Sequence, residues 1–321
     1  MNNKISHFIL HTLSFTLHTS HFILYAMPWS RIVSGIVAIA LALTMSFLGG
    51  WYFTLMFAVI VYLGQLEYFQ MVQSKGIAPA AKTTVVASQV LLIIATVSST
   101  LADAVMPVAG TFICFYLLFQ PKFATIADVS ASIMGLFYVG YLPSYWVRLR
   151  AIDSAAFSNL PFGGYWPITW TDFWEKANSA SLPQGFTATL LTFLCIWAAD
   201  IGAYTIGKFF GKTRLSEISP KKTVEGAVFG ITSSVAVAIA GAYYLHLPRS
   251  LFTGLALGLL IGIASLLGDL TESMLKRDAG VKDSGQLIPG HGGILDRTDS
   301  YIFTAPLVYY FVTLLLPLIT E

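Results

Sequence analysis

The chain has few charged residues and almost no cysteine. Of its 321 residues only 11% are charged, whereas a soluble globular protein carries about 25%. The 2 cysteines, Cys114 and Cys195, stand in apolar runs without metal-ligand spacing, as small buried hydrophobic residues do. The net charge is only +2 and no basic run alternates with aromatic residues, so we expect no nucleic-acid partner. The scarcity of charge excludes an ordinary soluble domain.

Long apolar runs take the place of the missing charge. Hydrophobic residues make up 56% of the chain, the mean hydropathy is +0.72, and crossing a bilayer takes roughly 20 apolar residues. The sequence therefore predicts an all-α, polytopic integral membrane protein with about nine transmembrane helices. The spans are expected near residues 32–49, 51–67, 83–101, 104–120, 126–146, 186–207, 227–246, 251–271 and 300–319, with short turns at Gly49-Gly50 and Ala102-Asp103.

Basic residues fall mainly on one side of this arrangement. With the N-terminus in the cytoplasm, the cytoplasmic segments hold 14 of the 18 lysines and arginines, and only Arg148, Arg150, Lys176 and Arg249 lie on the other side. Because basic loops stay in the cytoplasm, we expect a multi-pass protein of a bacterial-type inner (plasma) membrane. The polar loop after the eighth span then faces the cytoplasm.

Three regions are expected along the chain. Residues 1–26 hold four of the six histidines, and a metal-binding tail or a signal peptide are alternatives to the interpretation we favour, a dispensable extension before Met27. Residues 27–185 form the N-terminal helices and end in an aromatic loop with Trp166, Trp170 and Trp174, typical of a membrane interface, although a platform for incoming lipid is an alternative. Residues 186–321 form the catalytic transmembrane region with its cytoplasmic loops.

The eighth span carries a regular series of small residues. Gly254, Gly258 and Gly262 are spaced four apart, and in lipid such a stripe lets another helix approach closely. Gly226 and Gly230 have the same spacing in the preceding span. We expect tight helix packing at both.

The same span runs directly into a polar stripe. Asp269, Glu272, Ser273, Lys276 and Arg277 fall at i, i+3, i+4, i+7 and i+8, which is one face of a helix. If the last helix begins near Leu295, Asp296 and Asp299 share a face as well. The three aspartates 269, 296 and 299 are then predicted to meet across a helix pair, although pairing with nearby cations at the interface is the alternative.

A second polar face ends the sixth span. Asp200, Tyr204 and Lys208 are spaced four apart, and the loop that follows is rich in cations, which suit a triphosphate or anionic lipid heads but also fit the simpler role of setting topology. These loop cations are Lys208, Lys212, Arg214, Lys221 and Lys222. The run from Gly207 to Thr213 is one residue short of a P-loop and follows a helix, so a P-loop ATPase is not expected.

The polar segment resembles a family signature. Ser273, Lys276, Arg277, Lys282, Asp283, Pro289, His291, Gly292, Gly293, Asp296, Arg297 and Asp299 stand in the order S-x-x-K-R-x4-K-D-x5-P-x-H-G-G-x-x-D-R-x-D. This order resembles the signature of the phosphatidate cytidylyltransferases, also called CDP-diacylglycerol synthases, and the run Ser219–Gly226 resembles a second stretch of that family. The resemblance implies a polytopic membrane enzyme that joins CTP to phosphatidic acid among the membrane lipids and releases CDP-diacylglycerol and pyrophosphate with a divalent metal.

The expected chemistry assigns roles to these residues. Mg²⁺ is normally bound by one or two carboxylates together with substrate phosphates, so Asp269, Asp296 and Asp299 are the expected ligands, with enough oxygens for a second cation, K⁺ or another Mg²⁺. The basic residues expected at the phosphates are Lys276, Arg277 and Arg297, with Lys221 and Lys222 at the triphosphate. The remaining residues expected to bind substrate are Asp200, Tyr204, Lys208, Ser219, Ser273, Lys282 and His291, the last of which alternatively only fixes its loop.

Two other functions are compatible with parts of the pattern. A related enzyme could transfer the cytidylyl group to a different lipid alcohol or phosphate. A secondary transporter of anions would also need charges inside the membrane, but transporters tend to show internal repeats, and this sequence concentrates its charge in the last third. Whether the enzyme forms a homodimer stays open.

Overall fold

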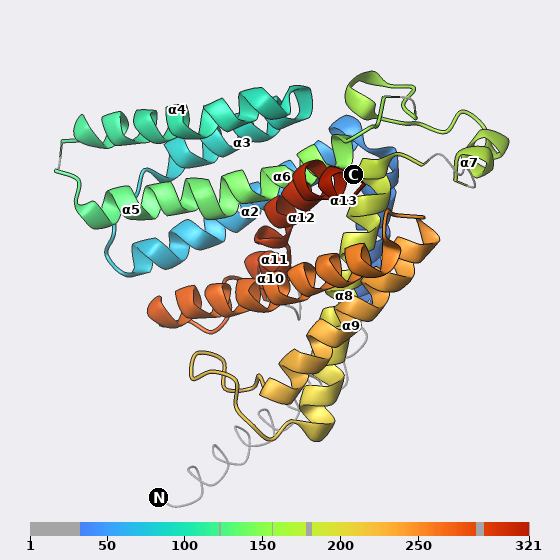
Figure 1. Ribbon diagram of the computed structural model, residues 1–321. Coiled ribbons are helices and arrows are strands. Elements are labelled where there is room, and N and C mark those ends of the chain that lie inside the picture. Colours follow the sequence, from blue (N-terminus) through green and yellow to red (C-terminus); the bar gives the residue numbers. More distant parts are fainter. Residues whose placement is uncertain (1–32, 122, 156, 178–181, 287–291, 321) are drawn as a thin grey trace, which may run out of the picture.

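A computed structural model describes residues 33–121, 123–155, 157–177, 182–286 and 292–320. These residues form helices and loops without an extended strand, and an isolated bridge joins Arg214 and Thr223 (Figure 1). The all-α prediction is confirmed. The helices are Val33–Leu48, α2 (Gly50–Ser74), α3 (Ala81–Val97), α4 (Ser99–Leu118), α5 (Ile126–Met134), η1 (Gly135–Tyr141), α6 (Leu142–Ala151), η2 (Pro161–Gly163), α7 (Trp170–Ala177), α8 (Gln184–Phe210), α9 (Val224–Tyr244), α10 (Ser250–Asp278), α11 (Leu295–Ile302), α12 (Thr304–Tyr310), η3 (Phe311–Leu315) and α13 (Leu316–Thr320).

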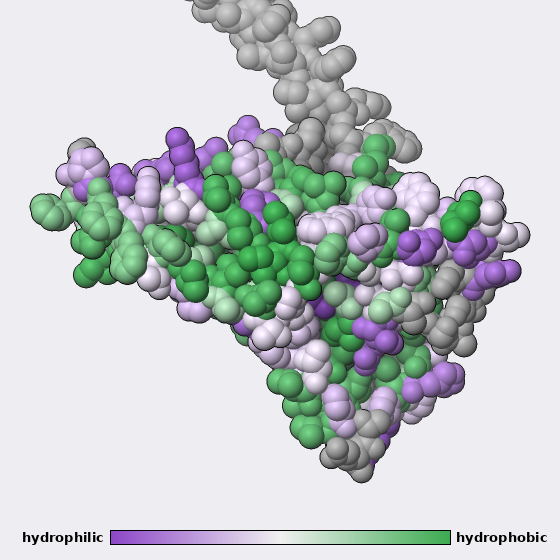
Figure 2. Space-filling view, turned by 90° about the horizontal axis from the view of Figure 1, so that it is seen from above, coloured by the Kyte–Doolittle hydropathy of each residue, from purple (hydrophilic) through white to green (hydrophobic). Residues whose placement is uncertain are grey.

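Seven stretches of the described chain are long and apolar enough to cross a membrane. Large hydrophobic side chains such as Leu55, Phe112 and Leu251 are more than half exposed on the helices, which is the expected surface of a protein that faces lipid. Hydrophobic residues cover much of the face in Figure 2, and hydrophilic ones gather toward its edges. The protein is thus a multi-pass membrane protein.

The predicted span boundaries need two corrections. Val33–Leu48 and Ala81–Val97 are apolar helices of fewer than 18 residues, so the expected count of about nine spans is not confirmed. The turn predicted at Ala102-Asp103 is wrong, because the break comes at Ser98, whose hydroxyl caps α4 by accepting a hydrogen bond from the Leu101 amide (3.3 Å). The turn predicted at Gly49-Gly50 is confirmed, since Gly49 has a φ of +61° between two helices.

Helices α8, α9 and α10 pack as antiparallel neighbours through glycine. A Cβ atom added at Gly254 or Gly258 of α10 would collide with the α9 backbone at Ile239 or Val235, and one at Gly262 would lie 3.0 Å from the Cα of Ile231. On the other side of α9, Gly230 faces the Ala199 carbonyl of α8 in the same way. The close packing predicted from the small-residue stripes is confirmed, and α9 runs antiparallel to both of its neighbours.

A further glycine brings α10 against the start of the last helices. A Cβ at Gly268 would collide with the carbonyl oxygen of Asp299, so its absence lets α11 lie directly on α10. The indole N–H of Trp146 on α6 donates to the carbonyl oxygen of Tyr301 (3.1 Å), and that of Trp197 on α8 donates to the Tyr301 hydroxyl (2.7 Å). Three helices therefore fix the orientation of α11.

The N-terminal extension and the aromatic loop are the two features whose predicted roles stay predictions. The extension, residues 1–26, lies outside the described residues, as does Met27. The aromatic loop between α6 and α8 presents Trp166, Trp170 and Trp174, each at least half exposed, as an interfacial belt requires.

The glycine packing generates a stability prediction. We expect Gly258→Ala to lower the free energy of unfolding in detergent by about 1–3 kcal/mol, because the added methyl group must push apart two backbones. Gly35→Ala is the control, because no atom lies within 4 Å of a Cβ added there. Thermal unfolding of the two variants checks this, and equal melting temperatures would contradict the packing.

Candidate active site

A polar cavity of about 630 Å³ lies where α8, α9, α10 and α11 meet the loop between α8 and α9. A volume of this size is typical of small-molecule sites. Ten of the residues predicted for the site line it: Asp200, Tyr204, Lys208, Ser219, Lys221, Lys222, Asp269, Asp296, Arg297 and Asp299. The cavity wall thus combines four carboxylates with four basic side chains.

Asp269 faces the loop across this cavity. Its carboxylate forms an ion pair with Lys222 and accepts a long hydrogen bond from the hydroxyl of Ser273, one turn further along α10 (3.4 Å). Both members of the ion pair are partly exposed, at 23% for the Lys222 side chain and 35% for that of Asp269. A pair with this exposure is held only weakly, so an incoming ligand can separate it.

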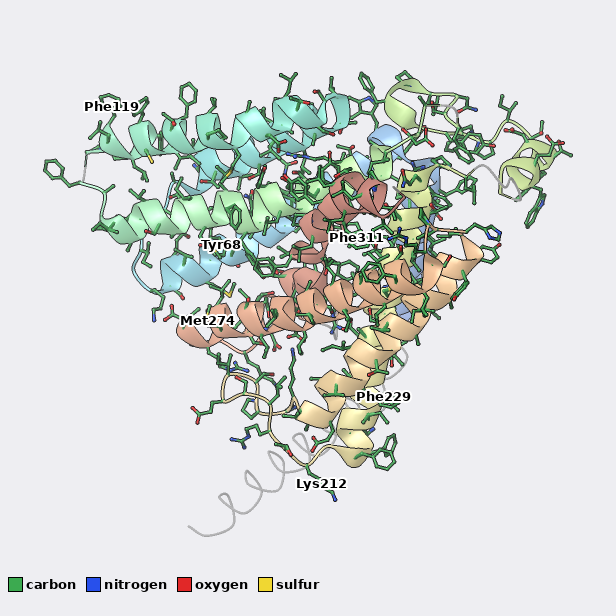
Figure 3. All side chains as sticks on the ribbon, viewed as in Figure 1. Tyr68, Phe119, Lys212, Phe229, Met274 and Phe311 are labelled. Carbon is green, nitrogen blue, oxygen red and sulfur yellow. The ribbon has the colours of Figure 1, made fainter. Side chains whose placement is uncertain are left out.

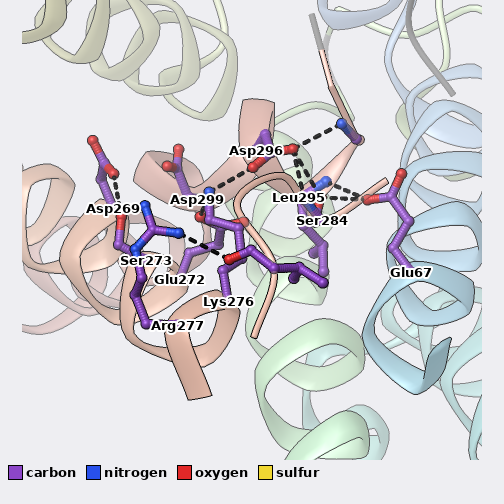
Figure 4. Close-up of polar contacts among 12 residues, drawn as sticks. Glu67, Asp269, Glu272, Ser273, Lys276, Arg277, Ser284, Leu295, Asp296 and Asp299 are labelled. Carbon is purple, nitrogen blue, oxygen red and sulfur yellow. Dashed lines mark hydrogen bonds and ion pairs between the residues drawn. The ribbon is translucent and has the colours of Figure 1, made fainter. Parts of the chain in front are cut away.

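Asp296 is held by several donors at once. Its Oδ1 accepts a hydrogen bond from the Lys276 ammonium (2.6 Å), and its Oδ2 accepts from the amides of Gly293 (2.8 Å) and Ser284 (2.9 Å). Lys276 also pairs with Glu272, which is 1% exposed. The buried lysine is thus neutralised by two carboxylates, and Figure 4 shows these contacts beside Asp269 and Asp299.

Arg297 and Asp299 lie in the first two turns of α11 and line the polar cavity. Asp299 Oδ1 accepts a hydrogen bond from the amide of Ser300 (2.7 Å). Asp200 enters the same cavity from α8. Among the residues that the structure describes, no three histidine, cysteine or acidic side chains are grouped closely enough to hold a metal ion, so the predicted meeting of three aspartates as metal ligands stays a prediction.

Four predicted residues lie beside the cavity or away from it. Ser273 and Lys276 are buried behind Asp269 and Asp296. Arg277 donates instead to the carbonyl oxygen of Val281 (2.8 Å), and Lys282 is exposed on the loop after α10. His291 lies outside the described residues.

Tyr204 and Lys208, which line the cavity, contact each other, with the Lys208 ammonium 3.4 Å from the phenol oxygen.

The backbone amides at the end of the stretch that is one residue short of a P-loop bind the side chain of Glu225, which belongs to α9. The amides of Lys212 and Thr213 donate to the carboxylate of Glu225, at 3.1 to 3.2 Å. Lys212 lies just after the end of α8, at the bottom of Figure 3, and is not among the cavity residues. Glu225 in the first turn of α9 therefore holds the start of this loop through its backbone amides.

Sequence reasoning missed two residues that hold the site together. Glu67 of α2 is 2% exposed and accepts hydrogen bonds from Ser284 and from the start of α11. An acid inside an apolar run is itself a signal of function, but the predicted second span ended at residue 67, whereas α2 continues to Ser74. Ser284 occupies an unspecified position of the signature.

A second cavity of about 640 Å³ adjoins this site and is almost entirely apolar. Helix Val33–Leu48, α2, α6, α8 and α11 line it with side chains such as Ala42, Met56 and Trp146. Arg297 lines both cavities, and Thr298 is beside it in the apolar one. Arg297 is therefore the described residue that the polar cavity and the apolar cavity share.

The sequence is similar to known proteins along most of its length. The model of the cytidylyltransferase family matches residues 29–315. A phosphatidate cytidylyltransferase from Synechocystis sp. is 63% identical over 298 residues, covering 92% of this chain and 100% of the relative, and the chloroplastic phosphatidate cytidylyltransferase 4 of Arabidopsis thaliana is 45% identical over 82% of this chain and 68% of its own length. A phosphatidate cytidylyltransferase from Staphylococcus aureus is 44% identical over 39% of this chain and 48% of its own length. The chain belongs to the cytidylyltransferase family and is a nucleotidyltransferase.

Proposed function

We propose that this protein is a phosphatidate cytidylyltransferase, which joins CTP and phosphatidic acid to give CDP-diacylglycerol and pyrophosphate. The observation that carries the proposal is the meeting of a cation-lined polar cavity and an apolar cavity at Arg297. A reaction between a nucleotide and a lipid needs such a junction, because one substrate is polar throughout and the other has long acyl chains. The names of the relatives give independent support.

The polar cavity suits the nucleotide. Lys208, Lys221 and Lys222 lie on its loop side with Ser219, and a triphosphate is bound by such donors through charge-assisted hydrogen bonds. Lys222 is held by Asp269 in this structure. A triphosphate would offer it a stronger partner and release the carboxylate.

The apolar cavity suits the acyl chains. Alanine, methionine and aromatic side chains from five helices line it, and Arg297 lines both this cavity and the polar one. A guanidinium can bind a phosphate through two parallel hydrogen bonds. We place the phosphate of the lipid at Arg297, with Lys276 close by through its contact with Asp296.

The carboxylates around the polar cavity fit a divalent cation by their chemistry. Asp269 and Asp299 present hard oxygen ligands on facing helices, and Mg²⁺ in proteins takes one or two carboxylates plus substrate phosphates. Asp296 already accepts from Lys276, Gly293 and Ser284, so it joins the set only if those bonds rearrange. A bound Mg²⁺, with or without a second cation such as K⁺, would supply charge neutralisation of the phosphates.

The remaining chemistry is positioning and electrostatics. A phosphate oxygen of the lipid attacks the α-phosphorus of CTP, the new P–O bond forms as the bond to pyrophosphate breaks, and no protein nucleophile is needed. Both substrates are anions, so Arg297 and the loop lysines lower the repulsion between them and hold them for in-line attack.

The proposed location is a bacterial-type inner membrane with the site facing the cytoplasm. The cavity lies along the C-terminal halves of α8 and α10, next to the loop that carries Lys212, Arg214, Lys221 and Lys222. Basic loops favour the cytoplasmic side, which is also where CTP is found.

The test is an assay of the purified protein with CTP, phosphatidic acid and Mg²⁺ that follows pyrophosphate. Release that depends on both substrates supports the proposal. Release with another lipid acceptor but not with phosphatidic acid would move the enzyme to a different substrate, and no release from a folded sample would overturn the assignment.

The loop lysines generate a prediction about CTP. Lys221→Ala should raise the KM for CTP by about tenfold, the effect of losing roughly 1.4 kcal/mol of charge-assisted binding, and should change the KM for phosphatidic acid little. Lys212→Ala is the matched control, because it removes the same charge from the same loop outside the cavity. Equal effects of the two changes would mean that Lys221 does not bind CTP and only helps to set the orientation of the protein in the membrane.

The apolar cavity generates the complementary prediction. Ala42→Phe should fill part of it and raise the KM for phosphatidic acid by roughly three- to tenfold, a loss of about 1 kcal/mol of apolar binding, with the KM for CTP unchanged. Ala40→Phe on the exposed side of the same helix is the control. A change in the KM for CTP alone would place the lipid elsewhere.

The carboxylates generate a prediction about metal. Asp269→Asn and Asp299→Asn should each lower kcat at least about 100-fold, a little under 3 kcal/mol of transition-state stabilisation. Mg²⁺ should raise the melting temperature of the wild type and raise that of these variants less. Asp296→Asn should also lower kcat at least about 100-fold, but it should reduce stability even without metal, since it breaks several buried hydrogen bonds.

Asp278→Asn serves as the control for the metal prediction. Asp278 is on the same helix, its side chain is 76% exposed, and its ion pair is with Lys75 outside the cavity. A wild-type protein that Mg²⁺ does not stabilise, or aspartate variants with full activity, would contradict the metal assignment.

A further inference from the structure

Glu67 is a buried acid on the first long helix, far in sequence from the signature. It lies in α2, within a helix stretch apolar enough to span the membrane, and only 2% of it is exposed. A carboxylate in such a place is costly unless charge or hydrogen bonds compensate it. Its partners therefore indicate what it is for.

Among the described residues, three groups donate hydrogen bonds to Glu67, and all three belong to the signature region. Oε1 accepts from the amide of Ile294 (2.8 Å), and Oε2 accepts from the amide of Leu295 (3.0 Å) and the hydroxyl of Ser284 (2.8 Å). Ile294 is the N-cap residue of α11 and Leu295 its first residue. A negative charge here satisfies amides that the helix leaves unpaired and interacts favourably with the helix dipole.

The loop is built to let this carboxylate approach. A Cβ atom added at Gly293 or at Gly285 would collide with the carboxylate of Glu67. A Cβ at Gly64, one turn earlier on α2, would lie 3.1 Å from the side chain of Leu295. Three glycines thus surround one contact between α2 and the signature region.

Glu67 is also connected to the site through Ser284. The Ser284 hydroxyl lies 2.8 Å from Glu67 and 3.1 Å from Asp296, and its amide donates to Asp296. Asp296 in turn holds Lys276. Figure 4 shows this series of contacts running from Glu67 through Ser284 and Asp296 to Lys276.

We infer that Glu67 is a positioning residue of the enzyme, which fixes the start of α11 so that Arg297 and Asp299 face the junction of the two cavities. It touches neither cavity among the described residues and acts through the Ile294 and Leu295 amides. This inference deepens the proposed function and rests on it for its kinetic part. Its structural part, that Glu67 holds residues 293–297 in place, can be tested without activity.

The central variant is Glu67→Gln. Glutamine keeps the shape but offers an N–H group on one side, where it meets a backbone N–H, so at least one amide of α11 loses its acceptor. We expect kcat with CTP and phosphatidic acid to fall about 10- to 100-fold at a temperature where the variant is folded, as expected when a reacting group is displaced by about 1 Å.

Asp128→Asn is the matched control. Asp128 of α5 is also buried, accepts hydrogen bonds from the amides of Ala78 and Thr125 (both 2.7 Å), and lines neither cavity. It should lose stability to a similar extent and keep its kcat. Hydrogen exchange of the amides at 293–297 should quicken in Glu67→Gln and stay unchanged in Asp128→Asn.

A double-mutant cycle separates positioning from general damage. In an Arg297→Lys background, Glu67→Gln should lower kcat by a smaller factor than it does in the wild type, because one of the two groups that it positions is already lost. In a Lys221→Ala background it should keep its full effect. If Glu67→Gln does not fold, Ser284→Ala carries the same cycle with an expected loss of about three- to tenfold, the effect of one hydrogen bond.

The outcomes are distinguishable. Unchanged exchange at 293–297 together with wild-type kcat, or equal losses in both backgrounds, would overturn the inference about Glu67. If the wild-type protein releases no pyrophosphate, the proposed function fails, and the exchange measurement alone decides whether Glu67 holds the loop.

Discussion

The site depends on the rule that a charge removed from water must find partners. Glu67, Asp296, Lys276 and Glu272 lie on three different helices, and each is at least half buried. Lys276 pairs with Glu272 and Asp296, and Ser284 links Asp296 to Glu67, so the four groups form one connected network. Because the network joins α2, α10 and the start of α11, satisfying its charges also fixes the helices that carry the cavity residues.

Patterns within a single helix could be interpreted from the sequence with success. The four-residue spacing of Asp200, Tyr204 and Lys208 places them on one face, and all three line the polar cavity. The start of the last helices at Leu295 and the glycine stripe of α10 are also confirmed. These features follow from helical periodicity, which depends only on local spacing.

The contacts between distant helices could not be predicted in this way. Glu67 is 227 residues from Ile294, and periodicity says which face a residue occupies but not which helix covers that face. The stripe on α10 shows the same limit. Asp269 lines the cavity, whereas Arg277, two turns further along, turns to the Val281 carbonyl. The apolar cavity needs five helices to enclose it, so no single segment signals it.

The depth of the site follows from helix length and direction. Helix α10 has 29 residues and spans about 43 Å, longer than the roughly 30 Å of a bilayer's hydrocarbon core, so its last turns can leave the apolar region. Since α9 runs antiparallel to both α8 and α10, the segments that precede their C-terminal ends both lie against the N-terminal half of α9. Asp200 and Asp269 each stand about 14 to 15 Å before those ends by helical rise, which explains why they share a cavity. A charge at the bilayer centre costs on the order of 3 kcal/mol on insertion scales; a few turns from the end, the same acids share the polar cavity with the loop lysines, and Lys222 pairs with Asp269 there.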